Sequence, residues 1–471
     1  MSHIKGDTSP ERRLVEDVRR GVRSAEAQVE RALQGLRDHA RLNLLVGPPM
    51  DEALTRARAI DRARAVGRSL GPLAGLPIVV KDNIAVAGRP LTGASPALKG
   101  YRPRRTAGSA ARLVDAGAVV VGQTNMHELA LGVTSDNGAH GPVRNPHDPR
   151  RTTGGSSGGT AAAVAAGAVL AGLATDTGGS GRIPAAWCGA VGFRPSAGRY
   201  PGDGVLNLPR TIDAVAVTAR SVDGLALLDG VLGDATATAV PALDELRLGV
   251  PRCCWSDVSP DVLAGCEEAL ARFRAAGVVL VPVDLERVHA VDREVNLPLV
   301  AHEVVGFWSA FAAEELGCDL PALVARLASP DVSERLTVLV AMLRRTADEY
   351  AELLAKVSQI GGLFHRLLGG LRLDAVAFPA VPVTAPLVGA TTVQLPSGER
   401  DVFEAVTATE TPASLAGIPA LTVPAGQDHE GMPFALELDG PAGTDRRLIA
   451  IGATLATLLR ATANPGGNPT R

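Results

Sequence analysis

Apolar residues recur every three or four positions in two N-terminal stretches, which predicts amphipathic helices over residues 12–38 and 51–66. A β-branched run, Ile78-Val79-Val80, follows a glycine- and proline-containing break and ends at Lys81, and this pattern predicts a buried strand. A helix and then an apolar strand are predicted over residues 109–122. The alternation of helices with apolar strands predicts an α/β protein, in which helices cover both faces of a sheet.

The pattern changes between residues 134 and 197, where glycine, serine, threonine and asparagine dominate two stretches around an alanine-rich helix at about 160–170. Long glycine-rich loops inside a compact domain are usually functional. The C-terminal half then returns to alternating helices and strands. Helices are predicted from 221 to 232, over 259–276, through most of 290–370 and over 445–459, and strands over 247–250, 278–283, 375–379, 420–424 and 434–438.

Charge and composition exclude several classes of protein. The 471 residues include 47 Lys+Arg and 50 Asp+Glu, a formal net charge of −3, so no basic surface is expected for nucleic acid or an anionic membrane. Residues 1–13 lack the apolar segment of a secretory signal. The longest apolar run, 160–175, is shorter than the roughly 20 apolar residues of a membrane span. We therefore expect a cytoplasmic protein that contacts neither nucleic acid nor membrane.

The cysteines and histidines give little indication of a metal site. Five cysteines, Cys188, Cys253, Cys254, Cys266 and Cys318, include no CxxC pair, which is typical of reduced, buried thiols. The adjacent Cys253 and Cys254 could sense redox state, but ordinary packing is the commoner role. The nine histidines show no HxxxH or similar ligand spacing, so we expect no metal ion.

Lysine is rare in this chain. Only four of the 47 basic residues are lysines, namely Lys5, Lys81, Lys99 and Lys356. Arginine keeps its proton in proteins, so among the lysines and arginines only these four could lose a proton. Lys81 ends an apolar strand, where desolvation favours the neutral amine that can accept a proton. The alternative interpretation is a surface lysine at a strand end.

Two glycine-rich stretches surround serines. The first, Gly154-Gly155-Ser156-Ser157-Gly158-Gly159, precedes the alanine-rich helix and could cradle a phosphate, but no Walker-type lysine follows it, and a flexible loop fits equally well. The second runs from Ala174 to Pro184 and places Ser180 on a turn of small residues. Such a turn would let backbone N–H groups converge on one point, as an oxyanion hole requires. Ser180 therefore has the surroundings of a nucleophile.

A nucleophilic serine needs a base, and the sequence offers two candidates. His127 is the best placed histidine, because Asn125 and Glu128 lie beside it, yet no histidine sits in a motif that singles it out. Lys81 is the stronger candidate because of its position at the end of an apolar strand.

These residues together resemble the amidase signature family. The stretch from Gly154 to Thr175, followed by Asp176-Thr177-Gly178-Gly179-Ser180, looks like the family's signature, and Pro77 to Asn83 resembles its lysine-bearing strand. The similarity extends over nearly the whole chain, through Thr124 to Leu129, Arg144-Asn145-Pro146, Cys188-Gly189, Ala413 to Pro424 and Gly440 to Gly443.

The resemblance implies a catalytic Ser–cis-Ser–Lys triad that works through an acyl-enzyme. The matching positions make Ser180 the nucleophile, Ser156 the bridging serine on a cis peptide, and Lys81 the base. Ser157 resembles a supporting serine, and Asp176 is expected to brace the nucleophile turn. The family's oxyanion hole maps to the backbone N–H groups of Thr177, Gly178, Gly179 and Ser180.

The resemblance also implies a single α/β/α domain over residues 1–471, with a mixed central sheet and no cofactor. The signature core would occupy about residues 70–220. A variable, largely helical region would cover about 290–370, and a frayed tail would begin at about 463. Met126 and Arg182 are the candidate substrate contacts, although Arg182 could equally brace its loop.

Within the family, the phrases around Met126, Tyr200 to Gly204 and Glu437 to Arg447 look most like indoleacetamide and mandelamide hydrolases. This similarity implies a small aryl-acetamide-type primary amide as substrate, although only 3% of residues are aromatic. Three rivals remain: an ammonia-releasing subunit of the glutamyl-tRNA amidotransferase type, a ureido or allophanate hydrolase with a polar pocket around Arg182, and a scaffold protein on an amidase fold. We leave a homodimer open.

Overall fold

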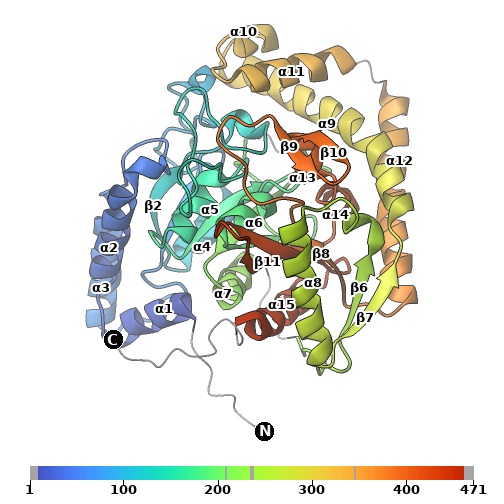
Figure 1. The fold of residues 1–471 in the computed structure, drawn as a ribbon. Coiled ribbons are helices and arrows are strands. Elements are labelled where there is room, and N and C mark those ends of the chain that lie inside the picture. Colours follow the sequence, from blue (N-terminus) through green and yellow to red (C-terminus); the bar gives the residue numbers. More distant parts are fainter. Residues whose placement is uncertain (1–8, 207–208, 234–237, 344–345, 461–471) are drawn as a thin grey trace.

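The computed structural model describes residues 9–206, 209–233, 238–343 and 346–460 (Figure 1). The tail predicted from about 463 lies outside these residues. The strands are β1 (Pro77–Lys81), β2 (Val119–Thr124), β3 (Ala171–Asp176), β4 (Val191–Arg194), β5 (Ala214–Ala219), β6 (Arg247–Pro251), β7 (Val279–Val283), β8 (Ala375–Pro379), β9 (Thr392–Leu395), β10 (Gly398–Asp401), β11 (Ala420–Gln427) and β12 (Pro433–Asp439).

Helices connect most of these strands. They are α1 (Pro10–Arg20), α2 (Ala25–Asp38), α3 (Ala53–Ala65), α4 (Gly108–Asp115), α5 (Gly158–Ala165), α6 (Arg182–Cys188), α7 (Val222–Leu232), α8 (Pro260–Ala275), α9 (Glu286–Glu315), α10 (Leu320–Val324), α11 (Pro330–Met342), α12 (Ala347–Gly370), α13 (Val402–Thr407), α14 (Thr411–Ala416) and α15 (Asp445–Arg460). Short 3₁₀ turns are η1 (Ala40–Leu42), η2 (Pro96–Leu98), η3 (Glu128–Ala130) and η4 (Arg252–Cys254).

Ten strands form one mixed sheet in the order β2-β1-β3-β5-β4-β11-β12-β8-β6-β7. Its two ends are parallel, because β1 pairs in parallel with β2 and β3, and β6 pairs in parallel with β7 and β8. Its middle is antiparallel, through β5, β4, β11 and β12. The predicted α/β class with a mixed central sheet is confirmed.

The sequence of strand β1 is a continuous apolar run because both faces of the strand are buried. Val79 packs with α2 and α5 on one face of the sheet, whereas Ile78 and Val80 pack with α4 and α7 on the other. A strand that is covered on both faces has no polar alternation. Figure 1 shows the helices on either side of the sheet, with α9 to α12 in yellow and orange forming an outer layer at one end.

The structure corrects two predicted helices. The helix predicted over 12–38 is two helices, because Gly21 adopts a left-handed conformation (φ 73°) after α1 and Ser24 caps α2 by accepting a hydrogen bond from the Ala27 amide. The helix predicted at about 160–170 ends at Ala165, since the chain reverses at Gly167 (φ 73°) and enters β3.

Strands β3, β4 and β5 were not predicted, and β3 consists mainly of small residues with weak strand preference. At Gly172 in β3, a Cβ atom would lie 2.8 Å from Val79 Cγ2 and from Thr160 Cγ2. Small residues therefore let β3 lie close to β1 and α5. No helix among the described residues is long and apolar enough to cross a membrane.

Candidate active site

Lys81 lies at the carboxyl end of β1 with its side chain fully buried. Its Nζ atom is 2.7 Å from Ser156 Oγ and 2.8 Å from Thr175 Oγ1. Asn83 Nδ2 also donates a hydrogen bond to Thr175 Oγ1, at 3.1 Å. The parallel pairing of β1 with β3 explains this arrangement, because both strands end at the same edge of the sheet.

Burial lowers the pKa of Lys81 to about 7, because the charged ammonium loses its hydration in this site. The carboxylates of Asp213 and Asp176 oppose this shift. The direct contacts of Nζ in this site are hydroxyl oxygens. The amine can therefore exist in its neutral, proton-accepting form near neutral pH.

Ser156 lies on the first glycine-rich loop and is fully buried. The peptide bond between Gly155 and Ser156 is cis. The carbonyl oxygen of Ser156 accepts hydrogen bonds from the His127 amide at 3.1 Å and from Ser135 Oγ at 3.4 Å. A Cβ atom on Gly155 would lie 2.9 Å from the Ser135 nitrogen, so glycine is required where these two segments meet.

Ser157 joins the two glycine-rich loops. Its amide donates to the carbonyl oxygen of Ser180 at 3.1 Å, and its Oγ donates to the carbonyl oxygen of Thr175 at 3.2 Å. Helix α5 begins directly afterwards, at Gly158. These contacts hold the backbone of Ser180 beside the residue that follows Ser156.

Asp176 organises the turn that carries Ser180. Its carboxylate accepts hydrogen bonds from the amides of Gly179 at 3.0 Å and Gly181 at 3.1 Å. Burial alone would raise its pKa, but Arg182 and Arg194 hold that pKa well below its usual range. Ser180 itself is 8% exposed, so it is the member of the group that solvent can reach.

Arg182 is fully buried, and all three guanidinium nitrogens are bound within the protein. It forms an ion pair and two side-chain hydrogen bonds with Asp176, and ion pairs with Glu410 at 2.7 Å and with Glu437. Its Nη2 also donates to Ser414 Oγ at 3.0 Å. The turn that carries Ser180 is thereby tied to the start of α14 and to β12.

The side chains of two other candidate residues, Met126 and His127, are also buried. Met126 is completely buried. The His127 imidazole contacts Asp331 at the start of α11, with Nε2 2.9 Å from Oδ2. Among the proposed oxyanion donors, the Gly179 N–H already donates to Asp176.

Two functional-site neighbours were missed from the sequence. Thr175 bonds Lys81, and Asp213 lies close enough for its charge to act on the Lys81 ammonium. The position of Thr175, directly before Asp176 in the signature, was the available signal. Asp213 stands just before β5, whose first residue, Ala214, pairs with Asp176.

A cavity of about 950 Å³ lies at this edge of the sheet. Ala85, which follows β1, and Arg210, which precedes β5, both line it. Leu206, on the same wall, accepts a hydrogen bond from Asn83 at 3.3 Å through its carbonyl oxygen. Crevices outside the carboxyl ends of parallel strands are the usual ligand sites of such sheets. Tyr101, Phe307, Phe311 and Tyr350 also line this cavity.

Comparison with known proteins decides the family. The Amidase family model matches residues 28–449. The chain belongs to the Amidase family.

Several proteins are similar to this amidase in sequence over most of its length. Mandelamide hydrolase from Pseudomonas putida is 36% identical over 94% of this chain and 89% of its own length. Indoleacetamide hydrolase from Agrobacterium vitis is 34% identical over 88% of this chain and 89% of its own length. A crystal structure of an amidase is 34% identical, with a TM-score of 0.84 over 94% of this chain and 98% of that one. This amidase is thus an amide-hydrolysing enzyme.

Proposed function

We propose that this amidase hydrolyses a small aryl-acetamide-type primary amide to the acid and ammonia through Ser180, Ser156 and Lys81. The observation that carries the triad is the 2.7 Å contact of Lys81 Nζ with Ser156 Oγ inside a buried site. Burial of Lys81 favours its neutral amine, and the Ser157 amide holds the Ser180 backbone in place through its hydrogen bond to the Ser180 carbonyl oxygen.

The mechanism follows from these contacts. Neutral Lys81 takes the Ser156 proton while Ser156 takes the proton of Ser180, whose Oγ attacks the amide carbonyl. The backbone N–H groups of the turn stabilise the oxyanion, and Thr177, Gly178 and Ser180 are its proposed donors because Gly179 is paired with Asp176. The proton returns to the leaving nitrogen, ammonia departs, and water then releases the acid from the acyl-enzyme.

Arg182 belongs among the positioning residues in this proposal rather than the substrate contacts. Its guanidinium is enclosed and bound to Asp176, Glu410 and Glu437, so it holds the nucleophile turn. Met126 is also completely buried, which supports a similar positioning role for it in this proposal.

The substrate class rests on the relatives and on the aromatic cavity. The two relatives are named as hydrolases of mandelamide and of indoleacetamide, and both of these amides carry an aromatic ring. The cavity wall formed by Tyr101, Phe307 and Phe311 offers rings on which an aryl group can stack. The low aromatic content of the whole chain is thus compatible with an aryl substrate, since the structure gathers several rings in one place.

Ammonia release from purified protein tests the proposal. Mandelamide, indoleacetamide and phenylacetamide should be hydrolysed, with allophanate and glutamine turned over poorly. Ser180→Ala and Lys81→Ala should each lose at least about 1,000-fold in kcat, whereas Lys356→Ala, which removes an exposed lysine paired with Glu294, should keep the wild-type rate.

Wild-type turnover in a folded Ser180→Ala variant would contradict the assignment of Ser180 as the nucleophile. Preference for glutamine or allophanate over every aryl amide would instead contradict the substrate class alone.

A further inference from the structure

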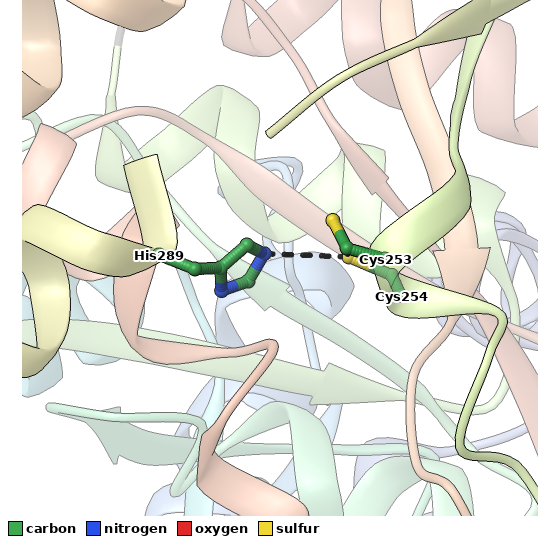
Figure 2. Close-up of side chains that lie close together, drawn as sticks. All are labelled: Cys253, Cys254 and His289. Atoms are coloured by element: carbon green, nitrogen blue, oxygen red, sulfur yellow. Dashed lines mark hydrogen bonds between the residues drawn. The ribbon is translucent and has the colours of Figure 1, made fainter. Parts of the chain in front are cut away.

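A second group of reactive side chains lies outside the catalytic residues. Cys253 and Cys254 lie in η4, directly after β6, and His289 lies in the first turn of α9. Figure 2 shows the imidazole of His289 directed at the paired cysteines. Cys254 Sγ is 3.5 Å from His289 Nε2 and 3.9 Å from Cys253 Sγ. In the described parts of the chain, this is the group of three side chains arranged to hold a metal ion, with one donor atom from each within 4.8 Å of the others.

The fold fixes the two segments that supply these donors. Cys254 packs in the same apolar cluster as Leu285 and Val288, which lead into α9 and form its first turn. Trp255 Nε1 donates to the Ala377 carbonyl oxygen of β8 at 3.3 Å, which anchors the cysteine segment to the sheet. The segments that carry the donor atoms are therefore fixed by packing and hydrogen bonding to the rest of the protein.

The distances match tetrahedral coordination by soft donors. With zinc–sulfur bonds of about 2.3 Å and zinc–nitrogen bonds of about 2.0 Å, tetrahedral angles place two sulfurs about 3.8 Å apart and a sulfur and a nitrogen about 3.5 Å apart. The observed separations of 3.9 Å and 3.5 Å fall within a few tenths of an ångström of these values. The cysteines are free thiols, so both sulfurs are available as ligands.

Access and charge also suit a divalent cation. Cys254 is buried, whereas Cys253 and His289 are half-buried, so an ion can reach the group from solvent. Two thiolates and a neutral imidazole carry two negative charges, which one divalent cation neutralises; binding transfers the two thiol protons to the buffer. Three protein donors leave a fourth coordination position for water or another small ligand.

We propose that Cys253, Cys254 and His289 form a binding site for one thiophilic divalent cation of the Zn²⁺ type. The site is separate from the Ser180 chemistry, which uses none of these side chains. It was missed from the sequence because His289 follows the cysteines by more than thirty residues, without a ligand-spacing motif.

Titration of the reduced, metal-free full chain with Co²⁺ tests the site. The wild type should bind one equivalent with thiolate-to-cobalt charge-transfer absorption and tetrahedral d–d bands, and Zn²⁺ should displace it. Cys253→Ser and His289→Ala should each weaken binding at least tenfold and reduce these bands. The half-buried positions of these two residues make both variants good candidates for normal folding, which a melting curve checks.

Matched controls separate this site from general metal uptake. Cys318→Ser removes another half-buried free thiol, and His429→Ala removes an exposed imidazole paired with Asp261, so both should bind Co²⁺ as the wild type does. Zn²⁺ should raise the melting temperature of the wild type but not of His289→Ala. Binding without thiolate bands, or equal binding by a folded Cys253→Ser/His289→Ala double variant, would overturn the proposal.

Discussion

At the scale of single residues, two buried cations have opposite roles because their neighbours differ. Lys81 contacts the hydroxyls of Ser156 and Thr175, and burial favours its neutral form. Arg182 instead lies among three acidic side chains, one of which is Asp176, and keeps its charge. The Asp176 carboxylate tends to raise the pKa of Lys81. Its ion pair with Arg182 largely compensates the negative charge of Asp176 and so weakens this effect.

The proposed role of Lys81 as base predicts an acidic limb in the pH profile. Its pKa is lowered from 10.5 to about 7, so kcat/KM should rise as pH increases through about 7 and fall below it, where the ammonium cannot accept a proton. Initial rates with mandelamide from about pH 5 to about pH 9 measure this limb.

Lys81→Arg should have no activity at any of these pH values, because arginine stays protonated. Lys356→Arg, at an exposed position, should keep the wild-type profile. An unchanged profile in a folded Lys81→Arg variant would exclude a lysine base.

Arg182→Met should lower the free energy of unfolding by about 3–5 kcal/mol, because removing one partner of a buried ion network leaves uncompensated carboxylates. Urea unfolding followed by circular dichroism measures the loss. Arg150→Met, which removes an exposed guanidinium paired with Asp148, should leave stability unchanged within error. Equal stability of the two variants would contradict a structural role for Arg182.

At the scale of elements, α9 serves two separate regions. His289 is in its first turn, and Phe311 is near its end, where it contacts Tyr101 with ring centroids 5.1 Å apart. A rise of 1.5 Å per residue places these two positions about 33 Å apart along the axis. The proposed metal site and the Phe311 end of the cavity therefore lie at opposite ends of one helix.

Phe311→Ala should raise KM for phenylacetamide by about tenfold or more, because the phenyl ring of the substrate would lose apolar contact area in the cavity. KM for propionamide, which has no ring, should change little. Leu297→Ala, at an exposed position of the same helix, is the control and should change neither constant. Equal effects on both amides would contradict an aryl role for the cavity.

At the scale of the whole molecule, one sheet runs through both halves of the chain. Its strand order places β11 and β12 between the N-terminal strands and β8. This continuity predicts that the protein unfolds as one cooperative unit. Scanning calorimetry should show a single transition, and two separated transitions would contradict one domain.

The sequence could predict elements whose local pattern is decisive. β1 reads as a strand because helices cover both its faces, whereas β3 escapes notice because its small residues are set by close packing against β1. The residues proposed for catalysis were predicted through their resemblance to a long local signature. The contacts of Arg182 with Glu410 and Glu437 could not be, because they join segments more than 200 residues apart.

The tie between Arg182 and Glu437 also has a consequence for synthesis. A ribosome produces the turn that carries Ser180 long before β12, so at that stage Arg182 lacks its partners Glu410 and Glu437. One edge of β4 likewise stays unpaired until β11 has been synthesised. Catalytic competence should therefore appear only when translation is nearly finished, and a premature stop before β12 should yield an inactive chain that exposes a sheet edge to chaperones.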